Sequence, residues 1–200
     1  MTMKNSKSLK RVLVIGGPTG SGESTITNEI IKKFPVFARL VTATSRKPRN
    51  KEQHGIDYYF FSKEEFEKNI EDGNILEYTF IKNRDTYYGA YKPDLDEKIA
   101  KGLNVIANVD IVGARYYKKN YDATTIFIKP KSTEELKGRL KNRDKNIDSE
   151  ELKKRIRNAE NEIEKEMSFY DYVVVNADRK LEEAIEKTIE ILKKEGYILA

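Results

Sequence analysis

Residues 17–25 read Gly-Pro-Thr-Gly-Ser-Gly-Glu-Ser-Thr, which is the pattern G-x-x-x-x-G-K-[ST] of a phosphate-binding P-loop with one departure. Glu23 stands where the pattern has its lysine. The backbone N–H groups of such a loop surround the phosphates, and the lysine adds a mobile positive charge. The residue type at position 23 therefore decides among an ordinary phosphotransferase, an altered one, and a binding protein that has kept the fold.

The glutamate is expected to oppose phosphate binding. Two opposite unit charges about 4 Å apart attract by about 4 kcal/mol at an effective dielectric constant of about 20, so an ionised Glu23 replaces that attraction with a repulsion of similar size. In a transition state, about 1.4 kcal/mol corresponds to a tenfold change in rate. Unless Mg²⁺, arginines or a side chain turned away from the phosphates compensates, the loss amounts to several powers of ten.

The neighbouring elements favour a P-loop over a glycine turn without a ligand. Residues 11–15 form an apolar run that predicts a strand, and residues 24–33 have helical character. The glycines let the loop turn its N–H groups toward an anion, at the positive end of the following helix. The residues expected to bind ATP here are Gly17, Pro18, Thr19, Gly20, Ser21, Gly22, Ser24 and Thr25. The Ser24 hydroxyl is also expected to bind Mg²⁺.

Composition limits the classes of function. The chain has 200 residues, 38% hydrophobic and 36% charged, with a formal net charge of +5. This length suits one globular unit, and the mixing of both charge signs favours a small polyanionic ligand over nucleic acid.

Cysteine is absent, which excludes disulfides and cysteine metal sites, and the only histidine, His54, lies in a polar stretch typical of an exposed loop. The basic, polar start does not resemble a signal peptide, and no apolar run could span a membrane. We expect a cytoplasmic monomer or homodimer.

Predicted strands and helices alternate along most of the chain. Apolar and β-branched runs predict further strands over residues 36–42, 58–61, 75–81, 104–109, 124–128 and 172–175. Helical spacing or capping predicts further helices over residues 62–70, 95–101, 111–119 and 181–192. This alternation predicts an α/β fold in which a parallel sheet is covered by helices on both faces.

Two segments depart from that alternation. Residues 43–90 combine a basic stretch, strands and one helix with a capping box at Ser62, and are expected to form a small inserted sheet with a helix. Residues 132–168 begin with a second capping box at Ser132, are highly charged and hold few core-sized side chains, which favours a mobile lid. The P-loop core would then comprise residues 1–42, 91–131 and 169–200.

Motifs beyond the P-loop resemble one family. They are Ser45-Arg46-Lys47-Pro48-Arg49, Glu52, Gly55, Asp57-Tyr58, Leu76-Glu77-Tyr78, Tyr87-Tyr88-Gly89, Val109-Asp110, Gly113-Ala114-Arg115, Arg139-Leu140 and Arg143. In this order and spacing they resemble the guanylate kinase family, from about residue 11 to the end. The resemblance implies transfer of the ATP γ-phosphate to GMP or dGMP with Mg²⁺, on a core with a nucleotide-monophosphate segment and a lid.

The resemblance also implies an acceptor site. Arg46 and Arg49 would bind the monophosphate with their planar guanidinium groups, and a solvated basic loop is the alternative that the pattern alone allows. Tyr58 and Tyr88 match positions that donate hydroxyls to the same phosphate, although half-buried packing is the ordinary explanation for tyrosines in strands.

Three further positions match the guanine site of the family. Guanine presents the N1–H and N2–H donors, and Glu77 and Asp110 match the two carboxylates that accept them. Thr42 matches a hydroxyl near the base. Ala90 stands where the family usually has serine or threonine, and the loss of one neutral hydrogen bond, about 1 kcal/mol, is expected to weaken the preference for guanine.

On the donor side, the resemblance implies roles for residues of the lid. Arg139, Arg143 and Arg155 match arginines that close over the transferring phosphoryl group, with solvated surface charges as the alternative. Asn176 matches a position near the adenine.

Two departures accompany Glu23. Asn108 stands where the family has an acidic residue near the P-loop lysine, and Val112 replaces the usual glutamine. We hypothesise that Glu23 and Asn108 form a hydrogen-bonded pair that rearranges the triphosphate site without destroying it.

The sequence thus predicts a guanylate kinase-like phosphotransferase with an altered ATP site and Glu23 at its catalytic centre. A second interpretation, from another class, is a non-catalytic module that binds a phosphorylated peptide or a regulatory nucleotide in the same pocket. A third is a kinase for another nucleotide.

Overall fold

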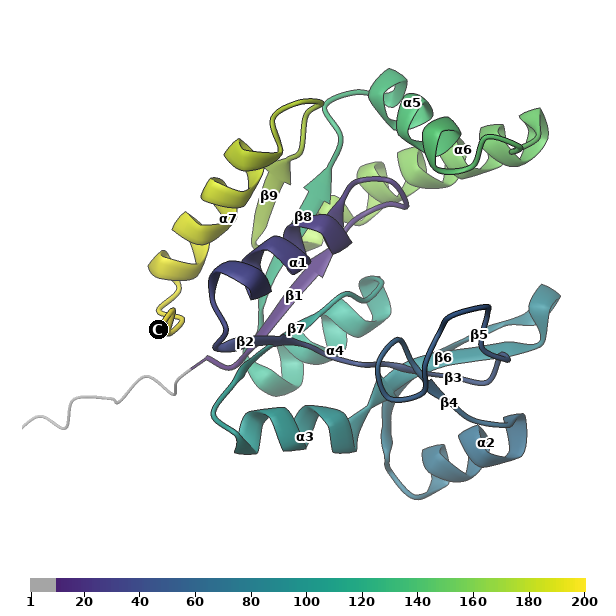
Figure 1. The fold of residues 1–200 in the computed structure, drawn as a ribbon, viewed down its shortest axis with the longest axis vertical. Coiled ribbons are helices and arrows are strands. Elements are labelled where there is room, and N and C mark those ends of the chain that lie inside the picture. The colour runs from purple at the N-terminus through teal and green to yellow at the C-terminus, as the bar shows by residue number, and fades with distance from the viewer. Residues whose placement is uncertain (1–9) are drawn as a thin grey trace, which may run out of the picture.

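The central sheet explains why the P-loop follows the first strand. In the computed structural model, which describes residues 10–200, five parallel strands form this sheet (Figure 1). In spatial order they are β2 (Phe37–Arg39), β7 (Asn104–Ala107), β1 (Val12–Gly16), β8 (Thr124–Lys129) and β9 (Tyr172–Val175). The expected core segment 1–42 begins with residues 1–9, which lie outside the described part. A parallel sheet inside an α/β fold is therefore confirmed.

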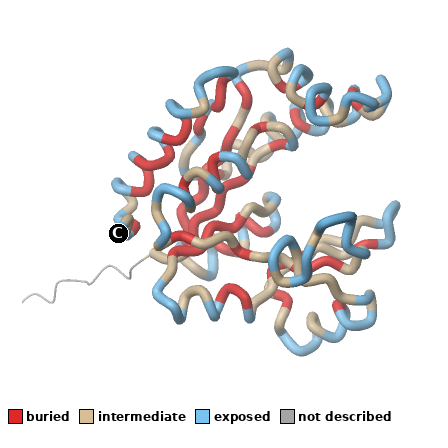
Figure 2. Tube along the Cα trace, viewed as in Figure 1, coloured by how far each residue is buried: buried red, intermediate tan, exposed pale blue. Residues whose placement is uncertain are grey.

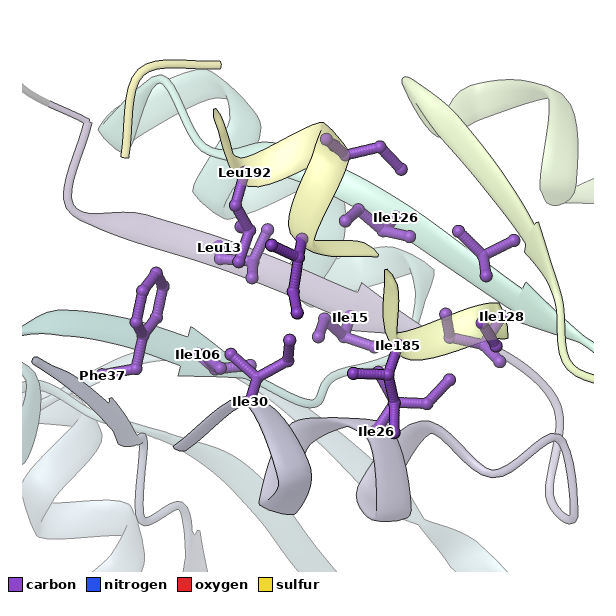
Figure 3. Close-up of a cluster of buried hydrophobic side chains, with 14 of the residues drawn as sticks. Leu13, Ile15, Ile26, Ile30, Phe37, Ile106, Ile126, Ile128, Ile185 and Leu192 are labelled. Atoms are coloured by element: carbon purple, nitrogen blue, oxygen red, sulfur yellow. The ribbon is translucent and has the colours of Figure 1, made fainter. Parts of the chain in front are cut away.

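Side chains of β1 alternate between two buried faces. Leu13 and Ile15 point into a core on one face of the sheet, which Ile26 and Ile30 of the following helix complete (Figure 3). The two valines of β1 belong to the core on the opposite face. Burial on both faces is typical of a central parallel strand and accounts for the continuous apolar run.

Helices cover each face of the sheet. The first face is covered by α1 (Glu23–Lys33) and α7 (Leu181–Lys194), and the second by α3 (Lys92–Ala100) and α4 (Ile111–Tyr121). Buried residues concentrate in the central strands and on the inner sides of these helices (Figure 2). No helix among residues 10–200 combines the length and apolarity that a membrane crossing requires.

A second sheet has four strands. In spatial order they are β4 (Tyr59–Phe60), β3 (Ala43–Thr44), β6 (Thr86–Tyr91) and β5 (Ile75–Ile81), with the short 3₁₀ helix η1 (Lys82–Arg84) between the last two in sequence. The helix α2 (Lys63–Glu71) begins with the expected capping box, in which Ser62 and Glu65 each accept the other's backbone N–H. The strand β6 was not predicted, because its tyrosines lack a clear alternation with polar residues.

The strand predicted over residues 36–42 was wrong in its extent. Leu40 still donates its N–H to Ile106 of β7 at 2.9 Å, but the N–H of Val41 donates to the carboxylate of Asp94 at 2.9 Å. This buried carboxylate takes the place of a neighbouring strand. The chain therefore leaves the central sheet and enters the second one as β3.

Residues 132–168 contain α5 (Thr133–Arg143), α6 (Ser149–Lys165) and the start of the 3₁₀ helix η2 (Met167–Phe169). The expectation of few core-sized side chains was only partly right, because the two helices share a small core of Leu136, Leu140, Leu152 and Ala159. The capping box at Ser132 is half formed: Ser132 accepts the N–H of Glu135 at 3.3 Å, but the Glu135 carboxylate accepts from Lys131 and Asp178 instead.

Candidate active site

Tight backbone contacts fix the shape of the P-loop. Gly22 ends the loop in the left-handed region, with φ 94°, and a Cβ there would lie 2.3 Å from Nδ2 of Asn176. A Cβ on Gly17 would lie 2.2 Å from the carbonyl oxygen of Ile128. Only glycine fits at these two positions, as the pattern requires.

Two side chains from outside the loop hold it in place. Asn176 donates its amide to the carbonyl of Ser21 at 2.8 Å. Arg139 of α5 donates to the carbonyls of Ser21 at 3.3 Å and Asn176 at 2.7 Å, and to the carboxylate of Asp178 at 2.9 Å. The Ser21 carbonyl of the P-loop is thus satisfied by α5 and by the segment after β9.

Glu23 is the first residue of α1, and its carboxylate accepts the hydroxyl of Ser21 at 2.7 Å. Burial raises the pKa of Glu23 above its ordinary value, while the Ser21 hydroxyl and then the charges of Arg143 and Arg39 lower it. The side chain is therefore turned toward its own loop. An acidic group at this end of a helix is also favoured by the helix dipole.

A first cavity, of about 390 Å³, lies against the loop and the end of β7. Four carboxylates line it: Glu23, Asp110, Glu162 and Glu166. Burial raises the pKa of Glu162 to about 7, with further contributions from the charges of the other three. The cavity is therefore unusually acidic for a site beside a P-loop.

A second cavity, of about 490 Å³, opens on the other side of the loop. Its lining brings together five of the nine predicted ATP residues, Glu23 and two arginines of α5, namely Gly20, Gly22, Ser24, Thr25, Asn176, Glu23, Arg139 and Arg143, with Ala177, Arg179 and Leu181. Arg139 and Arg143 are one turn apart on α5 and share the face that meets the loop.

A third cavity, of about 160 Å³, lies where the second sheet meets the end of β7. Thr42, Tyr58, Glu77, Thr79, Tyr88, Gly89, Asn108, Val109 and Asp110 line it. Burial, and then the charge of Asp110, raise the pKa of Glu77 to about 7. Two carboxylates in one small cavity provide the acceptors that a base edge with adjacent N–H donors requires.

Asp110 is held in place from two directions. One carboxylate oxygen accepts the N–H groups of Val112 and Gly113 at 3.0 and 3.1 Å, capping α4, and the other accepts the Thr79 hydroxyl at 3.2 Å. A Cβ on Gly113 would lie 3.1 Å from Oε1 of Glu77, so the glycine leaves room for the second carboxylate.

Arg46 lies beside this third cavity with a fixed geometry. Its guanidinium makes a bidentate pair with Glu52 at 2.6 and 2.8 Å, and its Cζ lies 5.0 Å from the centre of the Tyr58 ring. The hydrogen bond from Arg46 is the main cause that lowers the pKa of Glu52, to about 2. The side chain of Arg49 is exposed.

The family model described as guanylate kinase matches residues 9–195. The chain belongs to the guanylate kinase family. The guanylate kinase of Bacteroides thetaiotaomicron is 39% identical over 189 residues, covering 92% of this chain and 89% of the relative. That of Fusobacterium nucleatum is 37% identical, covering 93% and 97%.

A solved guanylate kinase, from Anaplasma phagocytophilum, matches with a TM-score of 0.71 and 29% identity over 95% of this chain and 88% of the other. A shikimate kinase from Bacteroides thetaiotaomicron matches with a TM-score of 0.50 at 16% identity, which shows a shared fold alone. The family resemblance of the sequence motifs is therefore confirmed.

Not every predicted residue of this family member reaches a cavity. Arg155 pairs with Glu151 at 2.8 Å and is not among the residues lining the cavities described above. Ala90 is fully buried and packs in the core instead of lining the third cavity. His54 is exposed, as expected of a loop residue, and accepts the N–H of Phe60 at 3.2 Å.

The hypothesis of a hydrogen-bonded Glu23 and Asn108 pair is wrong in this structure. Asn108 donates its amide to the carbonyl of Ile15 and the hydroxyl of Thr27, both at 3.0 Å, while Glu23 accepts from Ser21. An aspartate at position 108 could not donate to the Ile15 carbonyl. The asparagine is therefore explained by its contacts with β1 and α1, and both residues still line the first cavity.

Sequence reasoning missed Glu162 and Glu166 of the acidic cavity and Thr79 of the third, and it named Gly89 only as part of a family motif, without a role. Glu162 lies in the last turn of α6 and Glu166 caps its end, four residues further on, but the chain has many glutamate pairs at this spacing, and no sequence signal tells which of them meets the P-loop.

Proposed function

We propose that this chain is a guanylate kinase that transfers the γ-phosphoryl group of ATP to GMP or dGMP, with weakened catalysis at the ATP site. The observation that carries the proposal is the third cavity, where Glu77 and Asp110 face the same small volume beside Arg46. Two fixed acceptors suit the N1–H and N2–H edge of guanine, and adenine offers no such pair of donors there.

Each part of the site has a role in this reaction. Arg46, Arg49, Tyr58 and Tyr88 would bind the acceptor phosphate, and Glu77, Asp110 and Thr42 the base. An oxygen of that phosphate attacks the γ-phosphorus, the bond to the bridging oxygen breaks, and its electron pair stays on ADP. Arginines of the lid, Arg139 and Arg143 from α5 and Arg155 from α6, would neutralise the charge on the moving group.

The ATP side uses the P-loop and the second cavity, with Asn176 supporting the loop. Among residues 10–200 no group of three or more acidic or histidine side chains could hold a metal ion alone. Mg²⁺ commonly keeps several waters and is held by phosphates and one or two protein groups, so the exposed Ser24 hydroxyl fits such an ion. Bound there, Mg²⁺ would neutralise phosphate charge.

We also propose that residues 43–90 and 132–168 move as an acceptor segment and a lid around the core. Both lie beyond the carboxyl ends of the central strands (Figure 1), which is where ligands bind in such sheets. A cytoplasmic location and a monomeric or dimeric state stay predictions. No observation favours the non-catalytic phosphopeptide module.

A coupled assay of ATP with GMP, dGMP, AMP, UMP or CMP tests the proposal. We expect turnover of the guanine nucleotides, lost in Glu77→Gln and retained in Glu71→Gln, which changes an exposed glutamate at the end of α2. Faster turnover of another base would assign a different kinase. No turnover of any monophosphate by the natural chain, with turnover by Glu23→Lys, would refute the assignment.

A further inference from the structure

Arg39 is a cation between the two substrate sites that no motif identified. It is the last residue of β2, paired in register with Ile106 at the carboxyl end of the sheet. Its side chain crosses to the first two turns of α1, where Nη2 donates to the carbonyl of Ser24 and to Oδ1 of Asn28, both at 3.2 Å.

Part of the Arg39 guanidinium has no partner. Nε is buried and unpaired, and the hydrogen bonds made within residues 10–200 include none from Nη1. A buried guanidinium nitrogen is seldom left without an acceptor. Nη1 is therefore the donor that a ligand can reach, while Nη2 anchors the group to α1.

The surroundings of Arg39 place it near both reacting groups. Burial lowers its pKa, while the charges of Glu23 and then Tyr58 raise it, and arginine remains protonated in proteins. Glu23 belongs to the P-loop, and Tyr58 lines the third cavity. Arg39 itself lines none of the three cavities, but it is hydrogen-bonded to Ser24, which lines the second cavity, and Thr42, three residues further along the chain, lines the third. The guanidinium is therefore anchored between the P-loop and the acceptor cavity.

Other arginines lie near the two sites, and they differ from Arg39 in the elements that carry them. Arg139 is bound to Asp178 and two backbone carbonyls, and Arg46 is in a bidentate pair with Glu52. Arg143 of α5 lines the second cavity, and its charge lowers the pKa of Glu23. Arg39 alone among these four comes from the sheet edge between the donor and acceptor sites.

We propose that Arg39 is a catalytic residue that supplies, at the transferring phosphoryl group, the positive charge that the P-loop lysine gives in the usual pattern. This inference rests on the proposed function. When the acceptor oxygen attacks and the bond to ADP breaks, negative charge spreads over the γ-phosphoryl oxygens. Nη1, for which residues 10–200 provide no acceptor, donates to those oxygens, and Glu23 stays paired with Ser21.

A double-mutant cycle tests the inference. Arg39→Ala and Arg39→Lys are made in the natural chain and in Glu23→Lys, with Asn28→Ala as the control that removes one of the two anchoring hydrogen bonds on α1 and keeps the guanidinium. In the natural chain we expect Arg39→Ala to lower kcat by about 100-fold or more, as loss of one charge-stabilising donor does. The KM for GMP should change little, and Arg39→Lys should recover part of kcat.

The interaction between the two positions decides the outcome. In the Glu23→Lys background, which carries the lysine of the usual pattern, Arg39→Ala should cost less than about tenfold, because coupled residues deviate from additivity. Equal losses in both backgrounds, or a loss below about threefold in the natural chain at unchanged thermal stability, would overturn the role.

Binding measurements separate this inference from the proposed function. The probe is a bisubstrate ligand in which adenosine and guanosine are joined by five phosphates, titrated beside GMP. Arg39→Ala should weaken the bisubstrate ligand by about tenfold or more, or about 1.4 kcal/mol, and leave GMP affinity unchanged. Equal bisubstrate affinity in both chains refutes the role of Arg39, whereas failure of the natural chain to bind GMP refutes the proposed function.

Discussion

Lowering the pH from 8 to 6 is expected to weaken GMP binding by about tenfold through one carboxyl group. Burial and the charge of Asp110 raise the pKa of Glu77 from an ordinary 4.5 to about 7. The ionised fraction is then about nine-tenths at pH 8 and about one-tenth at pH 6. Guanine donates two N–H groups and needs the ionised form, so affinity follows that fraction.

Isothermal titration of GMP at the two pH values measures the effect. The GMP phosphate itself has a second pKa of about 6, so its own titration also changes GMP affinity between pH 6 and 8. Glu77→Gln shows the effect of the phosphate alone, and the effect of Glu77 is the difference between the natural chain and this variant. In two buffers of different ionisation enthalpy at pH 7, the natural chain should also release about half a proton on binding GMP, from a group that is half protonated there. A pH effect no larger than that of Glu77→Gln would refute the reasoning.

The same group affects stability with a defined sign. The folded pKa of Glu77 is raised above the unfolded value, so its contribution to stability is complete below pH 4.5 and is lost as the pH rises through about 7. The difference between 4.5 and 7 corresponds to about 3 kcal/mol at 1.36 kcal/mol per pKa unit. Glu77→Gln should therefore raise the melting temperature at pH 8 and have little effect at pH 4.

Three further outcomes follow from the site. Glu23→Lys should raise kcat with GMP by tenfold or more, because it replaces repulsion of about 4 kcal/mol with attraction, and an unchanged kcat in a coupled assay would contradict this. Glu162→Gln should strengthen Mg-ATP binding at pH 8 and have little effect at pH 6. Burial raises the pKa of Glu162 to about 7, so the natural carboxyl is already mostly protonated at pH 6. Titration of Mg-ATP at both pH values checks this prediction. Arg139→Ala should destabilise the P-loop by about 1.5–3 kcal/mol, the usual value for hydrogen bonds to charged groups. Arg155→Ala, which breaks a half-exposed pair with Glu151, should cost under about 1 kcal/mol in urea unfolding.

The fold was predictable wherever local signals and tertiary packing agree. The strand, glycine loop and helix at the P-loop, and the capping box at Ser62, are each set by residues within a few positions of one another. The break after Arg39 was not predictable, because it depends on Asp94, which is distant in sequence and accepts the N–H of Val41. The lid core escaped notice because its Leu and Ala residues are spread thinly over two charged helices.

The candidate site was predictable where the chemistry needs particular residue types. Glu77 and Asp110 meet in one cavity, as expected of a guanine site. Asn108 was misinterpreted, because its family position suggested a partner in Glu23, whereas the nearest group that needs its amide is the carbonyl of Ile15. The position of Glu162 in the acidic cavity depends on how α6 packs against the P-loop, and the sequence pattern alone does not determine that packing.

Glu23 affects the unliganded loop and the reaction in opposite directions. Its carboxylate accepts the Ser21 hydroxyl and lies at the positive end of α1, so it stabilises the loop without a nucleotide. The phosphates would occupy the same positive end, which means that ATP competes with a group already there. A lysine removes that competition and adds attraction, but it leaves the helix end without its acidic partner. The glutamate thus favours a stable empty loop over rapid transfer, and in the proposed reaction the positive charge would come from outside the loop, from Arg143 of α5 and Arg39 of the sheet edge.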